Sequence, residues 1–407
     1  MIRLAHRLIE AVAPKRIGEE FRPMLSSFWL ANLSDGILLA GGPLLVASLT
    51  RNAVLVALAS ILQRLPWMLV GLWAGVVADR HDRRLIAVVA NIGRVVLLAV
   101  LSLLVATDRA TIGIVLAMLL FMGAAEVFSD TSLDAMMPMV VPHADLGIAN
   151  SRMMFGHMGI NQLAGPPVGA ALFALGMALP FVAQAILLAA AATIVARLRL
   201  PPRQIAPSTD RNVVREIGEG MRWLWRDRPL RALTITVVTL NVTFGATIAV
   251  LVLYALERLN LGEQGFGLLL TATAVGGVIG TLVYGAIEKR VSAPTMLRAV
   301  LVAETATHLG FALTSTAWVA MIIAFVFGFE ASIWGTTAHA IRQRTVPEDM
   351  QGRVGAFYRV GGQSGLIVGG LLGGVLASAY GITAPYWFAF VGSVLIIIFI
   401  WGEMAEL

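Results

Sequence analysis

Four carboxylic acids lie inside long apolar segments of this 407-residue chain, where a charge is expensive to place. Asp35 is near the middle of the first segment, and Glu330 is near the middle of the tenth. Glu126 and Asp130 lie one helical turn apart in the fourth segment. A carboxyl group that loses its hydration favours the neutral form, so it can exchange a proton near neutral pH. The same group, once ionised, can bind a cation, which makes these four residues candidates for proton and cation binding.

Each of these polar positions also has a structural alternative. Asp35 could cap a helix break before Gly36, and Asp130 could form a salt bridge between helices. Glu304 and His308 are one turn apart in the ninth segment and could satisfy each other. Uncharged polar side chains that could hydrogen-bond a bound molecule, or simply pack between helices, are Asn32, Asn161, Gln162 and Asn241. Arginines placed near segment ends, where their side chains can reach the membrane surface or pair with acids, are Arg64, Arg94, Arg152 and Arg359.

Composition indicates the environment of the chain. Only 13% of the residues are charged and 58% are hydrophobic, against about 25% charged in a soluble protein, which predicts a polytopic membrane protein. The net charge of +6 comes from Lys and Arg between the apolar runs, which favours membrane orientation over nucleic-acid binding. The sequence has no cysteine, no His-Glu-x-x-His and no Gly-x-x-x-x-Gly-Lys-Ser/Thr, so we expect no enzymatic activity, metal or cofactor.

Twelve apolar runs are long enough to cross a bilayer, which takes about 20 helical residues each. We expect them at residues 24–48, 54–78, 85–106, 111–136, 148–174, 178–198, 231–256, 265–287, 295–315, 318–340, 355–379 and 384–403. The predicted fold class is an all-α polytopic membrane protein. Its predicted parts are an N-terminal six-helix half at 1–200, a cytoplasmic linker with an amphipathic helix at 201–230 and a C-terminal six-helix half at 231–407.

The two halves repeat one another at an offset of 205 residues. Of eleven glycines between positions 71 and 181, eight have a glycine 205 residues later, where chance would give about one. Gly71 and Gly75, for example, correspond to Gly276 and Gly280. Each repeat holds an even number of helices, so both copies enter the membrane from the same side. The repeats are therefore related by an axis along the membrane normal.

A charged loop follows the second apolar run, directly after glycines whose spacing would let a neighbouring helix approach closely. Its pattern, Gly-x-x-x-Asp-Arg-x-x-Arg-Arg, resembles the loop between the second and third helices of the major facilitator superfamily of transporters. The matching residues are Gly75, Asp79, Arg80, Arg83 and Arg84. Asp82 stands where that pattern usually has a glycine.

Other phrases are similar to the drug-antiporter branch of that superfamily and to its macrolide-efflux and enterobactin-exporter group. They are Gly165-Pro-Pro-Val-Gly169, Glu219-Gly-Met-Arg-Trp-Leu224 and Val346-Pro-Glu-Asp-Met-Gln-Gly352. The resemblance implies two pseudo-symmetric six-helix halves, with helices one, four, seven and ten around a central cavity. It also implies export of an amphipathic or cationic, drug-like small molecule in exchange for protons by alternating access. The alternatives are a dedicated siderophore or lipid-like metabolite exporter and, in a different class, a non-transporting membrane sensor.

The distribution of basic residues predicts the orientation. Lys and Arg concentrate before the first run and in alternate loops, so both termini and the Asp79 loop are predicted to be cytoplasmic. We expect a multi-pass monomer in the bacterial inner membrane, whose partners are small-molecule cargo, protons and the lipid bilayer.

The charged loop is a candidate gate. We expect Asp79 to face the beginning of the eleventh helix at 352–355, where the helix dipole is positive. Arg83 would pair with Asp130 or with Asp134 at the cytoplasmic end of the fourth helix. Together these contacts would latch an outward-open state. For proton coupling we expect Asp35 and Glu330 to be the first candidates, because they lie in different halves.

Overall fold

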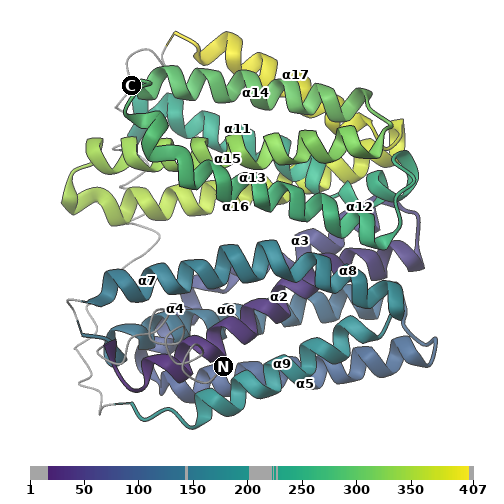
Figure 1. Cartoon of the computed structure of the whole chain (residues 1–407), viewed down its shortest axis with the longest axis vertical. Helices are drawn as coiled ribbons and strands as arrows, with labels where there is room; N and C mark the ends of the chain where they lie inside the picture. The colour runs from purple at the N-terminus through teal and green to yellow at the C-terminus, as the bar shows by residue number, and fades with distance from the viewer. Residues whose placement is uncertain (1–16, 143–144, 201–221, 223, 226–227, 403–407) are drawn as a thin grey trace, which may run out of the picture. The chain divides into compact units, whose positions relative to one another are not determined.

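A computed structural model describes residues 17–142, 145–200, 222, 224–225 and 228–402, and the regular structure of this part is helical (Figure 1). The first helices are α2 (Phe21–Leu49), α3 (Ala53–Leu69), α4 (Gly71–Arg80), α5 (Arg83–Ala106), α6 (Ile112–Val140), α7 (Leu146–Phe155), η3 (Gly156–Ala164), α8 (Gly165–Leu175) and α9 (Leu179–Ala196). The later ones are α11 (Arg228–Ile248), α12 (Leu251–Leu253), η4 (Tyr254–Arg258), α13 (Glu263–Glu288), α14 (Ala293–Leu313), α15 (Ala317–Thr345), α16 (Glu348–Tyr380) and α17 (Ala384–Ile400).

Each of the twelve predicted runs corresponds to one helix or to consecutive helices. The second run comprises α3 and α4, the fifth comprises α7, η3 and α8, and the seventh comprises α11, α12 and η4. Within the described residues, nine helices are long and apolar enough to cross a membrane, and α3 and α17 are shorter apolar helices. The prediction of an all-α, twelve-segment membrane protein is therefore confirmed.

The fifth segment changes its helical type before a pair of prolines. Pro166 and Pro167 have no backbone N–H, so the carbonyls of Gln162 and Leu163 cannot receive α-helical hydrogen bonds from them. The preceding residues 156–164 form the π-helix η3, and α8 begins at Gly165. Asn161 lies within this π-helix and is buried.

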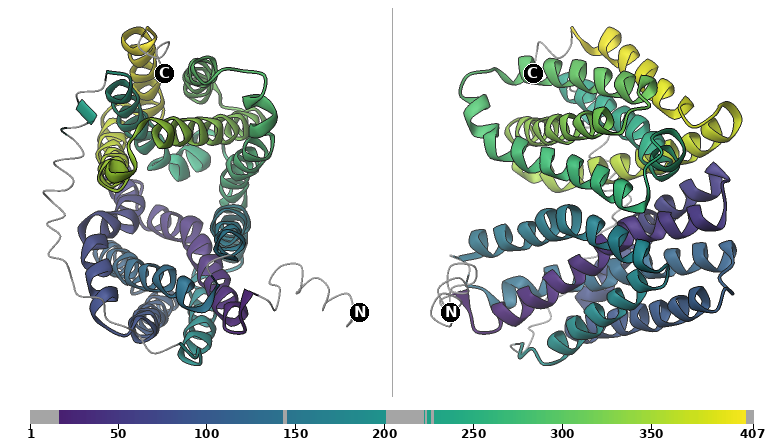
Figure 2. Two further views of the ribbon diagram at one scale, coloured as in Figure 1. Left: turned by 90° about the vertical axis from the view of Figure 1, so that its left-hand side faces the viewer. Right: turned by 45° about the vertical axis from the view of Figure 1, so that its right-hand side comes forward.

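The chain divides into two compact units. Unit 1 consists of Met1–Leu45 and Leu65–Ala206, and unit 2 consists of Val46–Arg64 and Pro207–Leu407. In unit 1, α5 lies between α6 and α9; in unit 2, α13 packs along α15, and α11 packs along α16 and α17 (Figures 1 and 2). The amphipathic helix predicted within 201–230 lies almost entirely outside the described residues.

Helix α5 shows how a membrane helix divides its faces. Its exposed side chains are large and apolar and recur every three or four residues: Leu85, Val89, Ile92, Val96, Val100 and Leu103. The opposite face is buried and includes Asn91, Arg94 and Ser102. Apolar side chains suit contact with lipid, whereas polar groups need partners inside the protein. The helix is therefore oriented by its polar residues, which turn toward the interior of unit 1.

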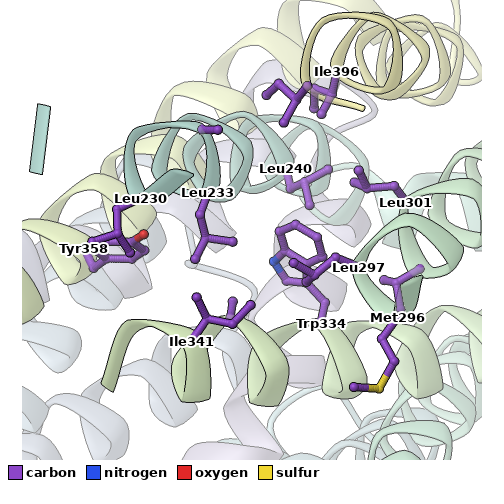
Figure 3. Packing of buried hydrophobic residues seen from close by; sticks show 14 of the residues in the cluster. Leu230, Leu233, Leu240, Met296, Leu297, Leu301, Trp334, Ile341, Tyr358 and Ile396 are labelled. Carbon is purple, nitrogen blue, oxygen red and sulfur yellow. The ribbon is translucent and has the colours of Figure 1, made fainter. Parts of the chain in front are cut away.

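Buried apolar clusters hold each unit together. In unit 2, Trp334 of α15 packs among Leu297 and Leu301 of α14 and Leu233 and Leu240 of α11 (Figure 3). Unit 1 has a corresponding cluster around α2, α6 and α9. These clusters fix the helices that carry the buried acids.

Of the two repeated pairs Gly71–Gly276 and Gly75–Gly280, the members in unit 2 make close helix contact. A Cβ atom built on Gly280 would lie 2.6 Å from the carbonyl oxygen of Phe329 and would also overlap the Ser332 hydroxyl, and one built on Gly276 would overlap Phe325. Thus α13 and α15 meet backbone to backbone. At Gly71 and Gly75 no described atom lies within 4 Å of such a Cβ. The close approach that the spacing predicted there is found instead at the corresponding positions of the second repeat.

Candidate functional site

The Arg94 guanidinium is the central charge of unit 1. Arg94 lies midway along α5 and is completely buried. Its Nη2 donates a hydrogen bond to Oδ1 of Asp35 on α2 and lies 3.8 Å from Oε2 of Glu126 on α6. One guanidinium therefore connects three helices. The placement of Arg94 near a segment end was wrong, because α5 extends eleven or more residues on both sides of it.

Asp35 lies beside other buried polar groups of α2. Its side chain is only 6% exposed, and its ion pair with Arg94 compensates the charge that burial would otherwise leave isolated. Asn32, one turn earlier, donates from Nδ2 to the carbonyl of Phe28 at 2.9 Å, so its amide is used within its own helix. Asp35 is inside α2 rather than at a break, since the helix continues to Leu49.

Helix α6 adds two more acids to this interior. The Glu126 side chain is 21% exposed, and Asp130 lies one turn further along the helix with a buried Oδ1 that has no hydrogen-bond partner in the described chain. Arg94 likewise has two buried nitrogens, Nε and Nη1, without a partner among the described residues. Unit 1 thus holds three carboxyl groups near one guanidinium, with hydrogen-bonding capacity left over. Such a cluster can take up a proton, a cation or the polar group of a ligand.

Unit 2 holds a second buried ionisable cluster. Glu330 of α15 is 3% exposed, and both of its carboxyl oxygens lack a hydrogen-bond partner in the described part of the chain. On α14, His308 Nε2 lies 3.4 Å from Glu304 Oε1, and both side chains are buried. Glu330 lies one turn after Phe327, whose ring centroid is 6.0 Å from that of His308, on the helix that packs against α14. The structure therefore joins three residues that the sequence presented as one lone acid and one separate pair.

The charged loop contains several local hydrogen bonds. Asp82 caps α5: its Oδ1 accepts from the backbone N–H of Arg84 at 2.8 Å and of Leu85 at 3.3 Å. Aspartate is a favourable N-cap residue. This explains why Asp82 can stand where the loop motif of the major facilitator superfamily usually has a glycine. Arg84 Nη1 donates to the carbonyl of Leu198 at 3.0 Å. The loop is thereby tied to the ends of α5 and α9.

Arg83 contacts the C-terminal end of α6 through a backbone carbonyl, and its predicted pairing with Asp130 or Asp134 stays a prediction. Its Nη1 donates to the carbonyl of Ala135 at 2.6 Å, and its Nε donates to the carbonyl of Ala78 at 3.1 Å. Asp134, the neighbour of Ala135, is exposed, as is Arg80. The backbone of Asp79 lies in α4, and its predicted contact with 352–355 stays a prediction.

The remaining polar candidates are scattered. Asn161 is buried in η3, where its backbone carbonyl packs against Gly36 of α2. Gln162 is exposed and its Nε2 lies 3.5 Å from His157 Nε2. Asn241 is half-buried on α11 and donates to the carbonyl of Val237 at 2.8 Å. None of these three contacts the charged clusters through an interaction recorded in the described residues. No group of three or more acidic or histidine side chains suited to a metal is found there either.

Arg94 and the Glu304–His308 pair are the buried ionisable residues to which the sequence analysis gave too little weight. Arg94 was in the middle of an apolar run, and an arginine at that depth requires an acid on a neighbouring helix. Asp35 and Glu126 lie in the first and fourth apolar runs, so the need of Arg94 for an acidic partner could have predicted that the three residues form a cluster. Glu304 and Glu330 are 26 positions apart on adjacent helices, and their proximity had no comparable signal in the sequence.

The chain matches the family model described as transmembrane secretion effector over residues 10–404. It is 24% identical over 367 residues to macrolide efflux protein A of Streptococcus pyogenes, covering 86% of each chain. It is 27% identical over 385 residues to the multidrug efflux pump Tap of Mycolicibacterium fortuitum, covering 88% of each chain.

Solved structures share the fold at low sequence identity. The nucleoside transporter NupG has a TM-score of 0.74 at 13% identity, with 95% of this chain and 98% of that chain covered. A bacterial homologue of the iron transporter ferroportin, in its inward-facing state, has a TM-score of 0.76 at 15% identity, with 95% and 99% covered. These similarities establish the arrangement of helices and carry no information about cargo.

Proposed function

Because the chain belongs to the transmembrane secretion effector family of the major facilitator superfamily, we propose that it exports an amphipathic or cationic small molecule in exchange for protons. Its class is that of a multi-pass, non-enzymatic efflux transporter. The exchange with protons and the kind of cargo are the new elements of the proposal. Because the family and the relatives indicate an efflux transporter, the alternative of a non-transporting membrane sensor is not supported.

The observation that carries the proposal is the presence of ionisable clusters inside both units. In unit 1, Asp35 and Glu126 share Arg94; in unit 2, the buried Glu330 lies on the helix that packs against the buried Glu304 and His308. Burying these charges is costly, and packing alone would be served as well by apolar side chains. A proton and a cationic cargo can bind the same carboxylate only one at a time. Binding of either one therefore displaces the other.

The relatives favour drug-like cargo. Macrolide and multidrug efflux are the activities in the names of two relatives that align along most of the chain. Alternating access would expose the clusters first to the cytoplasm and then to the outside. A dedicated siderophore or lipid-like metabolite exporter remains the second candidate, because an amphipathic cargo of that kind would use the same acids. We propose an inner-membrane monomer with cytoplasmic termini.

Transport into proteoliposomes tests this function. The purified protein is reconstituted into proteoliposomes with an acidic lumen, and uptake of ethidium and of a radiolabelled macrolide is measured. We expect uptake that depends on the pH gradient and stops when a protonophore is added. Uptake that is unaffected by the protonophore would contradict proton coupling. If only a siderophore or a lipid is taken up, the second candidate replaces the first. Liposomes without protein give the background.

A further inference from the structure

Three buried side chains of unit 2 converge between α14 and α15. Glu304 and His308 lie one turn apart on α14, with 3.4 Å between Oε1 and Nε2. The His308 ring also faces α15, since its centroid is 6.0 Å from that of Phe327, one turn before Glu330. Helices α14 and α15 pack along their length, so the face of α15 that carries Phe327 and Glu330 turns toward the Glu304–His308 pair. The three ionisable groups therefore belong to one cluster.

The cluster has no permanently charged base close to it in the described residues. On α14, Arg298 donates to the carbonyl of Trp401 at 2.7 Å, more than one turn before Glu304. Arg344 at the end of α15 pairs with Glu288 at the end of α13, at 3.1 Å. Arg258 of η4 donates to the carbonyls of Leu313 and Thr314 at the end of α14, more than one turn after His308. Other titratable groups on the packed elements are Tyr254, beside Phe311, Tyr386 of α17, Tyr284 and Glu263 of α13, and His339 and Arg342 near the end of α15.

The two units differ in the basic side chain that accompanies their buried acids. An arginine stays protonated in proteins, so the positive charge of Arg94 beside Asp35 is fixed. In unit 2 the basic side chain is a histidine, whose imidazole can exist either neutral or protonated. Two carboxylates and a neutral imidazole carry a net charge of −2. The cluster has a net charge of −1 with one bound proton and is neutral with two. A single positive charge of cargo can then replace one proton without leaving a net charge buried.

We propose that Glu304, His308 and Glu330 form the exchangeable proton site of this transporter, whereas the Asp35–Arg94 pair is a fixed ion pair that does not carry the exchanged proton. One proton enters the cluster from outside the cell, and it leaves to the cytoplasmic water when a cationic group of the cargo arrives. His308 and Glu304 act as positioning residues for the proton held by Glu330. The inference rests on the proposed proton-coupled export, and it assigns that coupling to specific side chains.

Two measurements on the full-length protein test this assignment. The first is infrared absorption of protonated carboxyl groups during a pH titration, with the wild type compared with Glu304→Gln, Glu330→Gln and His308→Gln. The second is proton release on addition of ethidium in weakly buffered solution. His339→Gln, an exposed histidine on the same helix as Glu330, is the matched control. Asp35→Asn tests the contrast with unit 1.

We expect the two glutamate variants to lose a titrating carboxyl band, and His308→Gln to shift its titration midpoint. Proton release should fall at least tenfold in all three, while His339→Gln retains it. Downhill ethidium exchange in the three variants would show that they fold. An unchanged band and unchanged release in Glu304→Gln and His308→Gln would overturn the site, as would loss of the titrating band only in Asp35→Asn. If the wild type itself releases no proton, the proposed coupling fails, and the infrared titration alone decides whether the cluster binds protons.

Discussion

At the scale of the residue, Arg94 is the side chain whose loss should be most damaging in unit 1. Arg94→Met would leave the buried Asp35 and the partly exposed Glu126 without their shared positive charge. Breaking a buried ion pair in this way costs about 3–5 kcal/mol. We expect a lower Tm in detergent and loss of transport. The double variant Arg94→Met with Asp35→Asn should recover part of the stability, because one uncompensated charge is removed.

The exposed Arg109, in the loop before α6, provides the comparison for that experiment. Arg109→Met removes the same charge from a position in contact with water, where single substitutions usually change stability by little. A Tm for Arg94→Met equal to that of Arg109→Met would show that Arg94 does not hold a buried ion pair.

At the scale of the element, the packing of α13 on α15 predicts unequal effects of one substitution at repeated positions. Gly280→Ala would place a methyl group against Phe329 and Ser332 of α15, so the two helices would have to separate. Overpacking of this kind costs about 1–3 kcal/mol. Gly75→Ala meets no described atom within 4 Å and should fold normally. The Tm and folded yield of the two variants check this expectation, and similar losses in both would contradict the observed contact.

At the scale of the whole molecule, the natural absence of cysteine allows the predicted orientation to be measured. Ser292→Cys lies in the loop before α14, next to basic residues, and Ser315→Cys lies in the loop before α15. Because basic loops remain on the cytoplasmic side, a membrane-impermeant maleimide added to intact cells should label only Ser315→Cys. Permeabilised cells should show both. If intact cells label only Ser292→Cys, the orientation is opposite to the predicted one.

The sequence by itself determined the fold class and the inventory of buried acids. The thickness of the bilayer sets a minimum helix length, so apolar runs can be counted without knowing how the helices pack. The cost of a buried charge likewise singled out Asp35, Glu126, Asp130 and Glu330 as positions that need an explanation. Both arguments depend on residues close together in the chain, which is why they could be made before any tertiary contact was known.

Only the tertiary structure decided which charges share a site. Asp35 meets Arg94, 59 positions away, and Glu330 lies on the helix that packs against the one carrying Glu304 and His308. It also decided that close glycine contact occurs at Gly280 and not at Gly75, although both belong to the same repeated pattern. The physical reason is that lipid is as apolar as a leucine side chain, so hydrophobicity does not determine which face of a membrane helix meets which neighbour. That choice comes from the fit of small residues, hydrogen bonds and buried charges between helices far apart in the chain.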